Sequence, residues 1–311
     1  MAEACSPIAS PDGPMNSSGL VVLRNADEAV RMPIVGLGGG IFTQDAESSF
    51  ASALDVGYRL IDSAPKYGEA EAALGRAWTR SGIARAELFL VSKVGNMGHA
   101  AALSSLEASL AKLQTAYLDL LLMHSAVHQP AAKQPRSKVH AEMRAETWRA
   151  MVEARAAGKV RAIGVCNHSP RQIAQLEPPP AVLQIEYHAL LQRPTWLKYA
   201  LEHGIVVQAY GGGGGGWALW KKDPRLDLLG RAPIVAAARA HGRSPTQISL
   251  RWQLEQGLCI IPKAASRVHQ EENRKPLFEF ALSEAEAEAI GALRDAGPVS
   301  LYRFKDPDEY L

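Results

Sequence analysis

The chain of 311 residues has little cysteine, little excess charge and no long apolar run, and each absence excludes a class of protein. Its three cysteines, Cys5, Cys166 and Cys259, are odd in number and widely spaced. This spacing argues against a disulfide framework and is typical of a reducing compartment. The formal net charge is only +2, so we expect neither nucleic acid nor an anionic membrane as a partner. No apolar stretch approaches the roughly 18 to 20 residues of a membrane-spanning helix. We therefore expect a cytoplasmic protein.

The N-terminal residues 1–19 also lack the pattern of a signal peptide. They are rich in Ser, Pro, Ala and Gly, and no basic start precedes an apolar stretch. This composition predicts a disordered leader over residues 1–19, followed by a single domain over residues 20–311.

From Leu20 onward, short apolar runs alternate with helical patterns. Two short segments, residues 20–23 and 30–32, predict an N-terminal β-hairpin. Eight candidate strands follow, at residues 34–38, 58–62, 88–93, 118–124, 160–167, 182–187, 205–210 and 258–263. Helical patterns lie between them at residues 48–55, 69–80, 100–113, 144–157, 171–176 and 195–203. An eightfold strand–helix alternation predicts an α/β fold of the (β/α)8 TIM-barrel type, and residues 234–240 and 284–292 predict two additional helices.

Three successive candidate strands end in a polar residue that a buried strand does not need. Asp62, Lys93 and His124 end the second, third and fourth strands, and Tyr67 follows in the loop after the second. Each has an ordinary structural explanation: a helix cap, a solvated lysine, or a histidine with a satisfied hydrogen bond. Because all four occupy equivalent places in consecutive units, and the carboxyl ends of barrel strands face one pocket, we favour a shared site.

These four groups suit a proton transfer. A free phenol has a pKa near 10, and a nearby lysine cation lowers that value by stabilising the phenolate. Asp62 compensates the charge of Lys93, which would be costly to bury alone. His124 offers a hydrogen-bond donor to a carbonyl oxygen that becomes an oxyanion.

Several short motifs, taken together, resemble the aldo-keto reductases over residues 30–292. They are GYRLIDSA at 57–64, YG at 67–68, SK at 92–93, LMH at 122–124, GKVRAIGVCN at 158–167, QIEYH at 184–188, HGIVV at 203–207 and IPK at 261–263. The resemblance implies a barrel that binds a nicotinamide dinucleotide without a Rossmann domain. Consistently, no G-x-G-x-x-G opens a predicted helix directly after a predicted strand.

The resemblance also implies a role for each residue of the site. Tyr67 would donate the proton in reduction, and Lys93 and Asp62 would adjust the pKa of Tyr67. His124 would orient the carbonyl. The expected cofactor-binding residues are Ile41, Asn167, Gln184, Tyr210, Gly211, Gly212, Lys263, His269, Glu272 and Asn273. Within this set, Asn167 and Gln184 match the positions that bind the nicotinamide carboxamide, and Tyr210 matches the aromatic that stacks on the nicotinamide ring. The expected substrate pocket consists of Phe42, Trp217 and Trp220; we expect no metal.

Two departures from the family pattern bear on the cofactor. Six glycines, residues 211–216, follow Tyr210 where the family usually has Ser-Pro-Leu-Gly. They predict either a backbone cradle for a pyrophosphate or a flexible loop that becomes ordered on binding. At the 2′-phosphate end, Ala264 and His269 replace the Ser or Thr and the Arg of NADP-selective members, although Arg267 lies nearby. We therefore expect NADPH as cofactor, with NADH possible. Cys166 stands where the family often has Ser.

Two other functions are compatible with parts of this pattern. Some relatives of the family bind nicotinamide nucleotide as sensors or regulatory subunits, but a sensor has no need of the Tyr67–Lys93 pair. A barrel enzyme of unrelated chemistry would need a metal cluster or phosphate-loop glycines, and only the glycine run favours it. We therefore expect a monomeric enzyme that acts on a small-molecule carbonyl substrate, which the sequence does not identify.

Overall fold

The computed structural model describes residues 19–26, 30–40, 45–128, 133, 138–214, 224–296 and 300. The leader predicted over residues 1–19 lies outside this part of the chain, apart from Gly19. None of the described helices is both long and apolar enough to cross a membrane.

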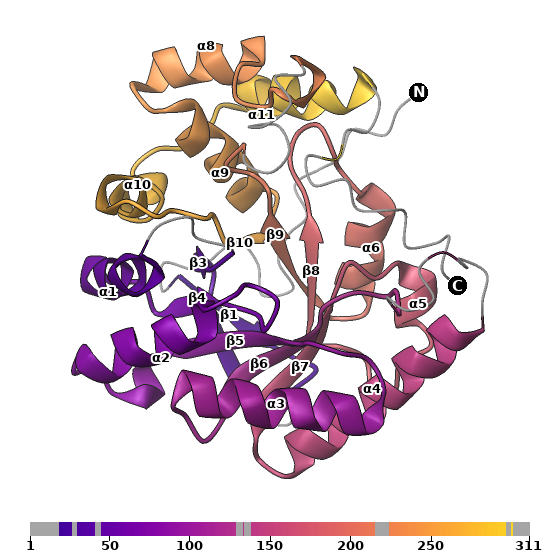
Figure 1. Ribbon diagram of the computed structural model, residues 1–311. Helices are drawn as coiled ribbons and strands as arrows, with labels where there is room; N and C mark the ends of the chain where they lie inside the picture. Colours follow the sequence, from indigo (N-terminus) through magenta and orange to yellow (C-terminus); the bar gives the residue numbers. More distant parts are fainter. Residues whose placement is uncertain are drawn as a thin grey trace.

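Eight parallel strands form one sheet, in which every strand pairs with its neighbours in chain order (Figure 1). They are β3 (Leu37–Gly38), β4 (Leu60–Asp62), β5 (Phe89–Val94), β6 (Leu118–Met123), β7 (Val160–Cys166), β8 (Val182–Glu186), β9 (Val206–Tyr210) and β10 (Cys259–Ile260). The sheet closes because Val35, just before β3, pairs in parallel with Ile260 of β10. The backbone N–H of Ile260 donates to the oxygen of Ile34 at 2.8 Å, and that of Gly36 donates to the oxygen of Ile260 at 2.9 Å. The predicted (β/α)8 barrel is confirmed.

Helices cover the outside of the barrel (Figure 1). They are α1 (Ala46–Val56), α2 (Ala70–Arg80), α3 (His99–Leu113), α4 (Val139–Ala156), α5 (Pro170–Ile173), α6 (Pro194–Glu202), α8 (Ala232–His241), α9 (Pro245–Glu255), α10 (Arg267–Glu272) and α11 (Glu284–Gly291). The helices α8 and α11 exceed the eightfold repeat, at the places predicted for the two additional helices, and they pack against each other.

The helix starts follow from local chemistry. Before α9, the Ser244 hydroxyl accepts from the backbone N–H of Gln247 at 3.2 Å, and the Gln247 side-chain oxygen accepts from the N–H of Ser244 at 3.0 Å. The same reciprocal pair joins Ser283 to Glu286 at the start of α11. Such pairs satisfy two backbone donors that a helix leaves without partners.

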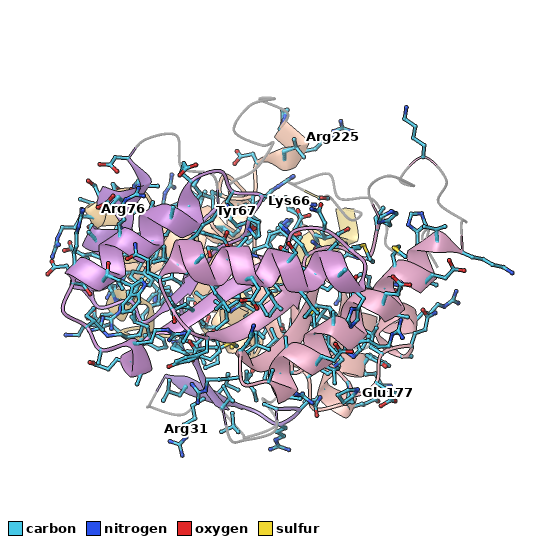
Figure 2. All side chains as sticks on the ribbon, turned by 60° about the horizontal axis from the view of Figure 1, so that its bottom comes forward. Arg31, Lys66, Tyr67, Arg76, Glu177 and Arg225 are labelled. Atoms are coloured by element: carbon cyan, nitrogen blue, oxygen red, sulfur yellow. The ribbon has the colours of Figure 1, made fainter. Side chains whose placement is uncertain are left out.

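The N-terminal hairpin lies at the end of the barrel where the strands begin. It consists of β1 (Leu20–Leu23) and β2 (Val30–Pro33), which pair antiparallel. The side-chain nitrogen of Asn25 donates to the oxygens of Pro180 and His203, which precede β8 and β9. Arg31 of β2 accordingly lies on the opposite side of the molecule from Lys66 and Tyr67 (Figure 2). The hairpin therefore closes the end of the barrel that is remote from the predicted site.

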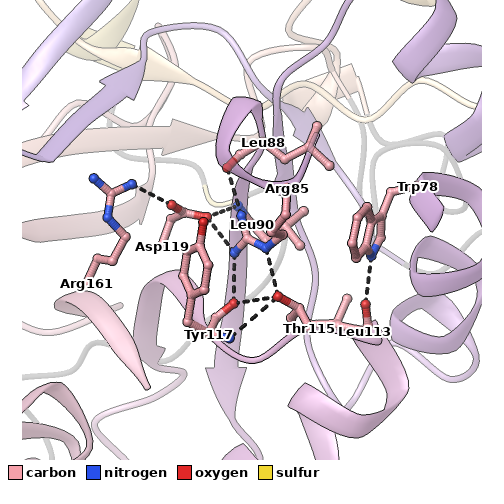
Figure 3. Close-up of polar contacts among 9 residues, drawn as sticks. All are labelled: Trp78, Arg85, Leu88, Leu90, Leu113, Thr115, Tyr117, Asp119 and Arg161. Atoms are coloured by element: carbon pink, nitrogen blue, oxygen red, sulfur yellow. Dashed lines mark hydrogen bonds and ion pairs between the residues drawn. The ribbon is translucent and has the colours of Figure 1, made fainter. Parts of the chain in front are cut away.

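A buried carboxylate, Asp119, stabilises the same end of the barrel, where the strands begin (Figure 3). Asp119, near the start of β6, is fully buried and pairs with Arg85 and Arg161, each at 2.8 Å. It also accepts from the backbone N–H of Leu90 at 2.9 Å. The Arg85 guanidinium donates further to the oxygens of Leu88 and Tyr117. This network ties three neighbouring strands to the loops that precede them.

Candidate active site

The structure joins Asp62 and Lys93 in a buried ion pair at the carboxyl ends of β4 and β5. The Lys93 Nζ lies 2.7 Å from each carboxylate oxygen of Asp62 and 3.0 Å from the backbone oxygen of Ser63. The side chain of Lys93 is 0% exposed and that of Asp62 is 4% exposed. Burial alone would lower the pKa of Lys93, but Asp62 and Tyr67 outweigh it and the pKa is raised. Lys93 is therefore a permanent cation beneath the mouth of the barrel.

Tyr67 and His124 lie directly beside this pair. The Lys93 Nζ is 4.8 Å from the centroid of the Tyr67 ring. The rings of Tyr67 and His124 meet edge to face, with centroids 5.7 Å apart. All four residues that the sequence pattern singled out thus come together on one rim, where Figure 2 labels Tyr67.

The protonation of Tyr67 differs from what the sequence predicted. Burial raises the pKa of the phenol to about 12, and this effect exceeds the lowering that Lys93 provides. Asp62 and Cys166 raise the pKa further. The predicted influence of Lys93 therefore has the expected direction, but the expected net depression of the pKa is wrong. The reason is that the sequence shows the cation and does not show that the Tyr67 ring packs against the core, where the phenolate is poorly solvated.

His124 is neutral at physiological pH. Burial lowers its pKa to about 3, and the charges of Lys93 and Lys66 lower it further. A neutral imidazole carries one N–H donor and one acceptor nitrogen. His124 can therefore donate a hydrogen bond to an uncharged carbonyl oxygen without adding a second cation.

A chain of hydrogen bonds runs from the ion pair across the ends of β7, β8 and β9. The Gln184 side-chain nitrogen donates to Asp62 at 2.8 Å and to Gln208 at 2.7 Å. The Cys166 thiol donates to the Gln184 oxygen at 3.4 Å and accepts from the Asn167 nitrogen at 3.2 Å. The Tyr210 hydroxyl donates to the Asn167 oxygen at 2.7 Å. The sequence did not indicate that Cys166 and Gln208 would link these groups, although a polar Gln208 in the apolar run VVQAY was an available signal.

The hydrogen-bonding capacity left over suits a primary carboxamide. Both N–H groups of Gln184 are used within the protein, which leaves one acceptor lone pair on its oxygen. Asn167 keeps one N–H and one lone pair, and its φ of 57° turns it out of the strand. Together the two residues can donate to a carboxamide oxygen and accept from its nitrogen, beside the ring of Tyr210. The residues present therefore fit the nicotinamide end of a dinucleotide.

The described part of the glycine run forms a turn. The N–H of Gly214 donates to the oxygen of Gly211 at 3.2 Å, and both glycines have positive φ. Gly212 lies against the buried side chain of Gln253, where a Cβ would approach the amide nitrogen to 2.2 Å. Four predicted site residues, Ile41, Phe42, Trp217 and Trp220, lie outside the described residues.

The residues predicted for the adenosine end lie together on and beside α10. His269 is exposed on this helix, and Asn273 is buried at its end, next to the partly buried Glu272. Lys263 is exposed just after β10 and runs past Gly40. Arg267 forms ion pairs with Asp55 at 2.6 Å and with Glu271 at 2.8 Å. Arg267, the cation that could have replaced the missing arginine at the 2′-phosphate, is thus already paired within the protein.

Comparison with known proteins agrees with this geometry. The sequence model of a protein family, described as "Aldo/keto reductase family", matches residues 35–295. A curated aldo-keto reductase from Mycobacterium sp. (strain MCS) is 34% identical over 90% of this chain and 92% of its own. Morphine 6-dehydrogenase from Pseudomonas putida is 35% identical over 87% of this chain and 90% of its own.

Solved structures give the same result. An aldo/keto reductase from Brucella melitensis superposes with a TM-score of 0.74 at 32% identity, covering 88% of this chain and 98% of its own. A second, MGS-M4 from a deep-sea metagenome library, has a TM-score of 0.76 at 28% identity, covering 89% of this chain and 97% of its own. With its closed barrel, its clustered Asp, Tyr, Lys and His, and these relatives along nearly its whole length, the chain belongs to the aldo/keto reductase family.

Proposed function

We propose that this protein reduces an aldehyde or ketone to an alcohol, with Tyr67 as proton donor and NADPH as the preferred cofactor. The observation that carries the proposal is the placement of a Tyr–His pair over a fully buried Lys93–Asp62 ion pair. A nucleotide sensor would gain nothing from burying two charges beneath a phenol, because each buried ion costs free energy.

Each side chain has a distinct role in the proposed reaction. A bound reduced nicotinamide would supply a hydride to the carbonyl carbon. The Tyr67 hydroxyl donates a proton to the carbonyl oxygen, and neutral His124 donates a hydrogen bond to the same oxygen. Lys93 stabilises the phenolate that remains on Tyr67, and Asp62 holds Lys93 in place. Asn167, Gln184 and Tyr210 would hold the nicotinamide.

We also propose that the reaction runs in both directions. The Pseudomonas putida relative is named a dehydrogenase. In the oxidative direction the Tyr67 phenolate takes the proton from the alcohol, so the same residue serves as base.

The proposed preference for NADPH is narrow. Lys263 offers one cation at the adenosine end, while Ala264 carries no hydroxyl and His269 replaces a guanidinium. A hydrogen bond to a charged group contributes about 1.5 to 3 kcal/mol. Losing one such bond would reduce a preference of one to two orders of magnitude to a small one.

The direct test is the Tyr67→Phe variant. Removal of the proton donor should lower kcat for carbonyl reduction by about 10² to 10⁴-fold, the usual contribution of general acid catalysis. Cofactor affinity, measured by fluorescence titration, should be unchanged.

Tyr117→Phe is the matched control, because Tyr117 stacks under Arg85 at the far end of the barrel. It should keep full activity. Retention of more than about a tenth of the activity in Tyr67→Phe would contradict the assignment, since each tenfold corresponds to roughly 1.4 kcal/mol.

A further inference from the structure

A small pocket lies beside His124, where the chain leaves β5 and β6. Its volume is about 210 Å³. Met97 and Met123 contribute apolar surface, and Asn96, Ser125, His128 and Lys66 contribute polar groups. Because Lys66 directly precedes Tyr67 and His124 itself lines the pocket, a molecule bound there would lie next to the proposed reacting groups.

Among the described residues, this pocket carries a positive charge that no carboxylate pairs with. No acidic residue is among the described residues that line it, and within that part of the chain no carboxylate pairs with Lys66. The nearest acid in sequence, Glu69, exerts its charge on Arg76 of α2. Along the chain, residues 124–141 contain three Lys or Arg and no Asp or Glu. The positive charge of Lys66 is also felt at His124, whose pKa it helps to lower.

The pocket lies on the side of the barrel mouth away from the expected nucleotide. Asn167, Gln184 and Tyr210 follow β7, β8 and β9, and Lys263 and Asn273 follow β10. The pocket instead follows β5 and β6. Lys66 is therefore not one of the cations expected to meet the phosphates of a dinucleotide, and its charge is available to the substrate.

We propose that this pocket selects carbonyl compounds that carry a carboxylate, and that Lys66 binds that carboxylate while the carbonyl lies between Tyr67 and His124. The inference rests on the proposed carbonyl reduction and adds a substrate class to it. A lysine presents a compact point charge, which suits one carboxylate. Asn96 and Ser125 can donate further hydrogen bonds. A pocket of about 210 Å³ has room for a small carboxylate-bearing carbonyl compound, so the proposed substrates are oxo-acids.

The test compares two aldehydes of nearly equal shape, 4-carboxybenzaldehyde and the neutral 4-carbamoylbenzaldehyde, with NADPH. We expect kcat/KM to favour the carboxylate about tenfold at low ionic strength, which corresponds to about 1.4 kcal/mol. Lys66→Met should bring the ratio of the two values to about one, and Lys66→Glu should invert it. Lys66→Arg, which keeps a cation at this position, should retain the preference for the carboxylate. The preference should also fall as salt is added, because salt screens exposed charges.

The matched control is Lys112→Met, which removes an exposed lysine from the outer helix α3 and should leave the ratio as in the wild type. A wild-type ratio near one, or the same ratio in Lys66→Met, would overturn the proposed substrate class while leaving carbonyl reduction intact. An equal loss of kcat/KM for both aldehydes in Lys66→Met would also overturn it, since Lys66 would then act on Tyr67 and not on the carboxylate. Absence of turnover of both aldehydes in the wild type would overturn the proposed function and this inference together.

Discussion

Two titratable side chains at the barrel mouth have pKa values that are displaced in opposite directions. Burial raises the pKa of Tyr67 to about 12 and lowers that of His124 to about 3. Both groups are therefore uncharged across the physiological range, above a Lys93 that stays charged. In the proposed reaction, these groups would present two neutral hydrogen-bond donors to a neutral carbonyl, and Lys93 would already be in place to compensate the developing negative charge.

This arrangement predicts the pH dependence of the reaction. Since Tyr67 stays protonated below about pH 12 and His124 stays neutral above about pH 3, kcat/KM for reduction should be flat from about pH 5 to 9. Oxidation needs the phenolate, whose fraction rises about tenfold per pH unit below the pKa, so its rate should rise throughout that range. Steady-state profiles in both directions provide the measurement. The expectation would be contradicted if the kcat/KM profile for reduction changed slope near pH 6.5 and this change disappeared in His124→Gln, because the histidine would then titrate.

At the adenosine end, we predict that His269→Arg increases affinity for NADPH and leaves that for NADH little changed. A guanidinium can bind a phosphate through two parallel hydrogen bonds, which a neutral imidazole cannot do. His269 is exposed on α10, so the larger side chain has room. Fluorescence titration should show a gain of about tenfold, or 1.4 kcal/mol, for NADPH.

Arg267→Met is the control for that prediction, since Arg267 pairs with Asp55 and Glu271. It should lower NADPH affinity little. An unchanged dissociation constant in His269→Arg would mean that position 269 does not face the 2′-phosphate.

At the scale of single residues, the sequence predicted which side chains would meet but not how they are protonated. Asp62, Lys93 and His124 could be assigned because strand ends in a barrel share one face. The pKa of Tyr67 could not, because it depends on burial by residues distant in sequence. The link from Cys166 through Gln184 to Gln208 was missed for the same reason, since alternation alone does not show which inward-facing residues touch.

Among the elements, the glycine turn after β9 is closely packed against α9. Gly212 has no room for a Cβ, because Gln253 of α9 is buried beneath it and donates to the oxygen of Tyr187. At Gly213, one residue further, an added Cβ would meet a single atom within 4 Å among the described residues, a methyl carbon of Thr246 at 4.0 Å. The two adjacent glycines thus differ sharply in the space that each leaves for a side chain.

We predict that Gly212→Ala destabilises the protein by about 1 to 3 kcal/mol, the usual cost of overpacking. It should also weaken cofactor binding, because the displaced turn adjoins Tyr210. Gly213→Ala should be close to wild type in both respects. Thermal unfolding and cofactor titration of the two variants test this, and equal behaviour of the pair would show that the turn yields easily.

Element boundaries were predictable where local chemistry marks them. Ser-Pro or Ser-x-x-Glu patterns in the sequence, at Ser169, Ser244 and Ser283, directly precede the starts of α5, α9 and α11. By contrast, α10 was not predicted, because its six residues contain a single apolar side chain, Val268, which is 61% exposed. A helix this short has no apolar face for a periodicity search to detect. β10 is shorter than predicted, at Cys259–Ile260, and Pro262 beyond it has no N–H to donate to a strand ladder.

Considered as a whole, the molecule separates reactivity from stability along the barrel axis. The proposed reacting groups lie where the strands end, and the Asp119 network of Figure 3 lies where they begin. Arg85 is mostly buried, with 14% of its side chain exposed, whereas Arg161 is 41% exposed. Loss of the carboxylate would leave a largely buried cation without its counter-charge.

We therefore predict that Asp119→Asn lowers the free energy of unfolding by about 3 kcal/mol, since breaking a buried pair costs about 3 to 5 kcal/mol. Its kcat/KM, corrected for folded protein, should equal that of the wild type. Arg161→Met removes the exposed partner and should cost about 1 kcal/mol or less. Urea denaturation and activity assays measure both. A drop in kcat/KM in Asp119→Asn would show that the two ends of the barrel are coupled.

The closure between Val35 and Ile260 has a consequence for biosynthesis. These two residues are joined across most of the chain, so the edge of β3 stays unpaired until the segment that contains β10 has left the ribosome. An unpaired strand edge can pair with another chain, and contacts of long sequence separation form slowly. A nascent chain that stops before β10 would retain all four side chains of the proposed active site and still expose an open sheet. Truncated products should therefore be lost to aggregation rather than accumulate as partly active enzyme.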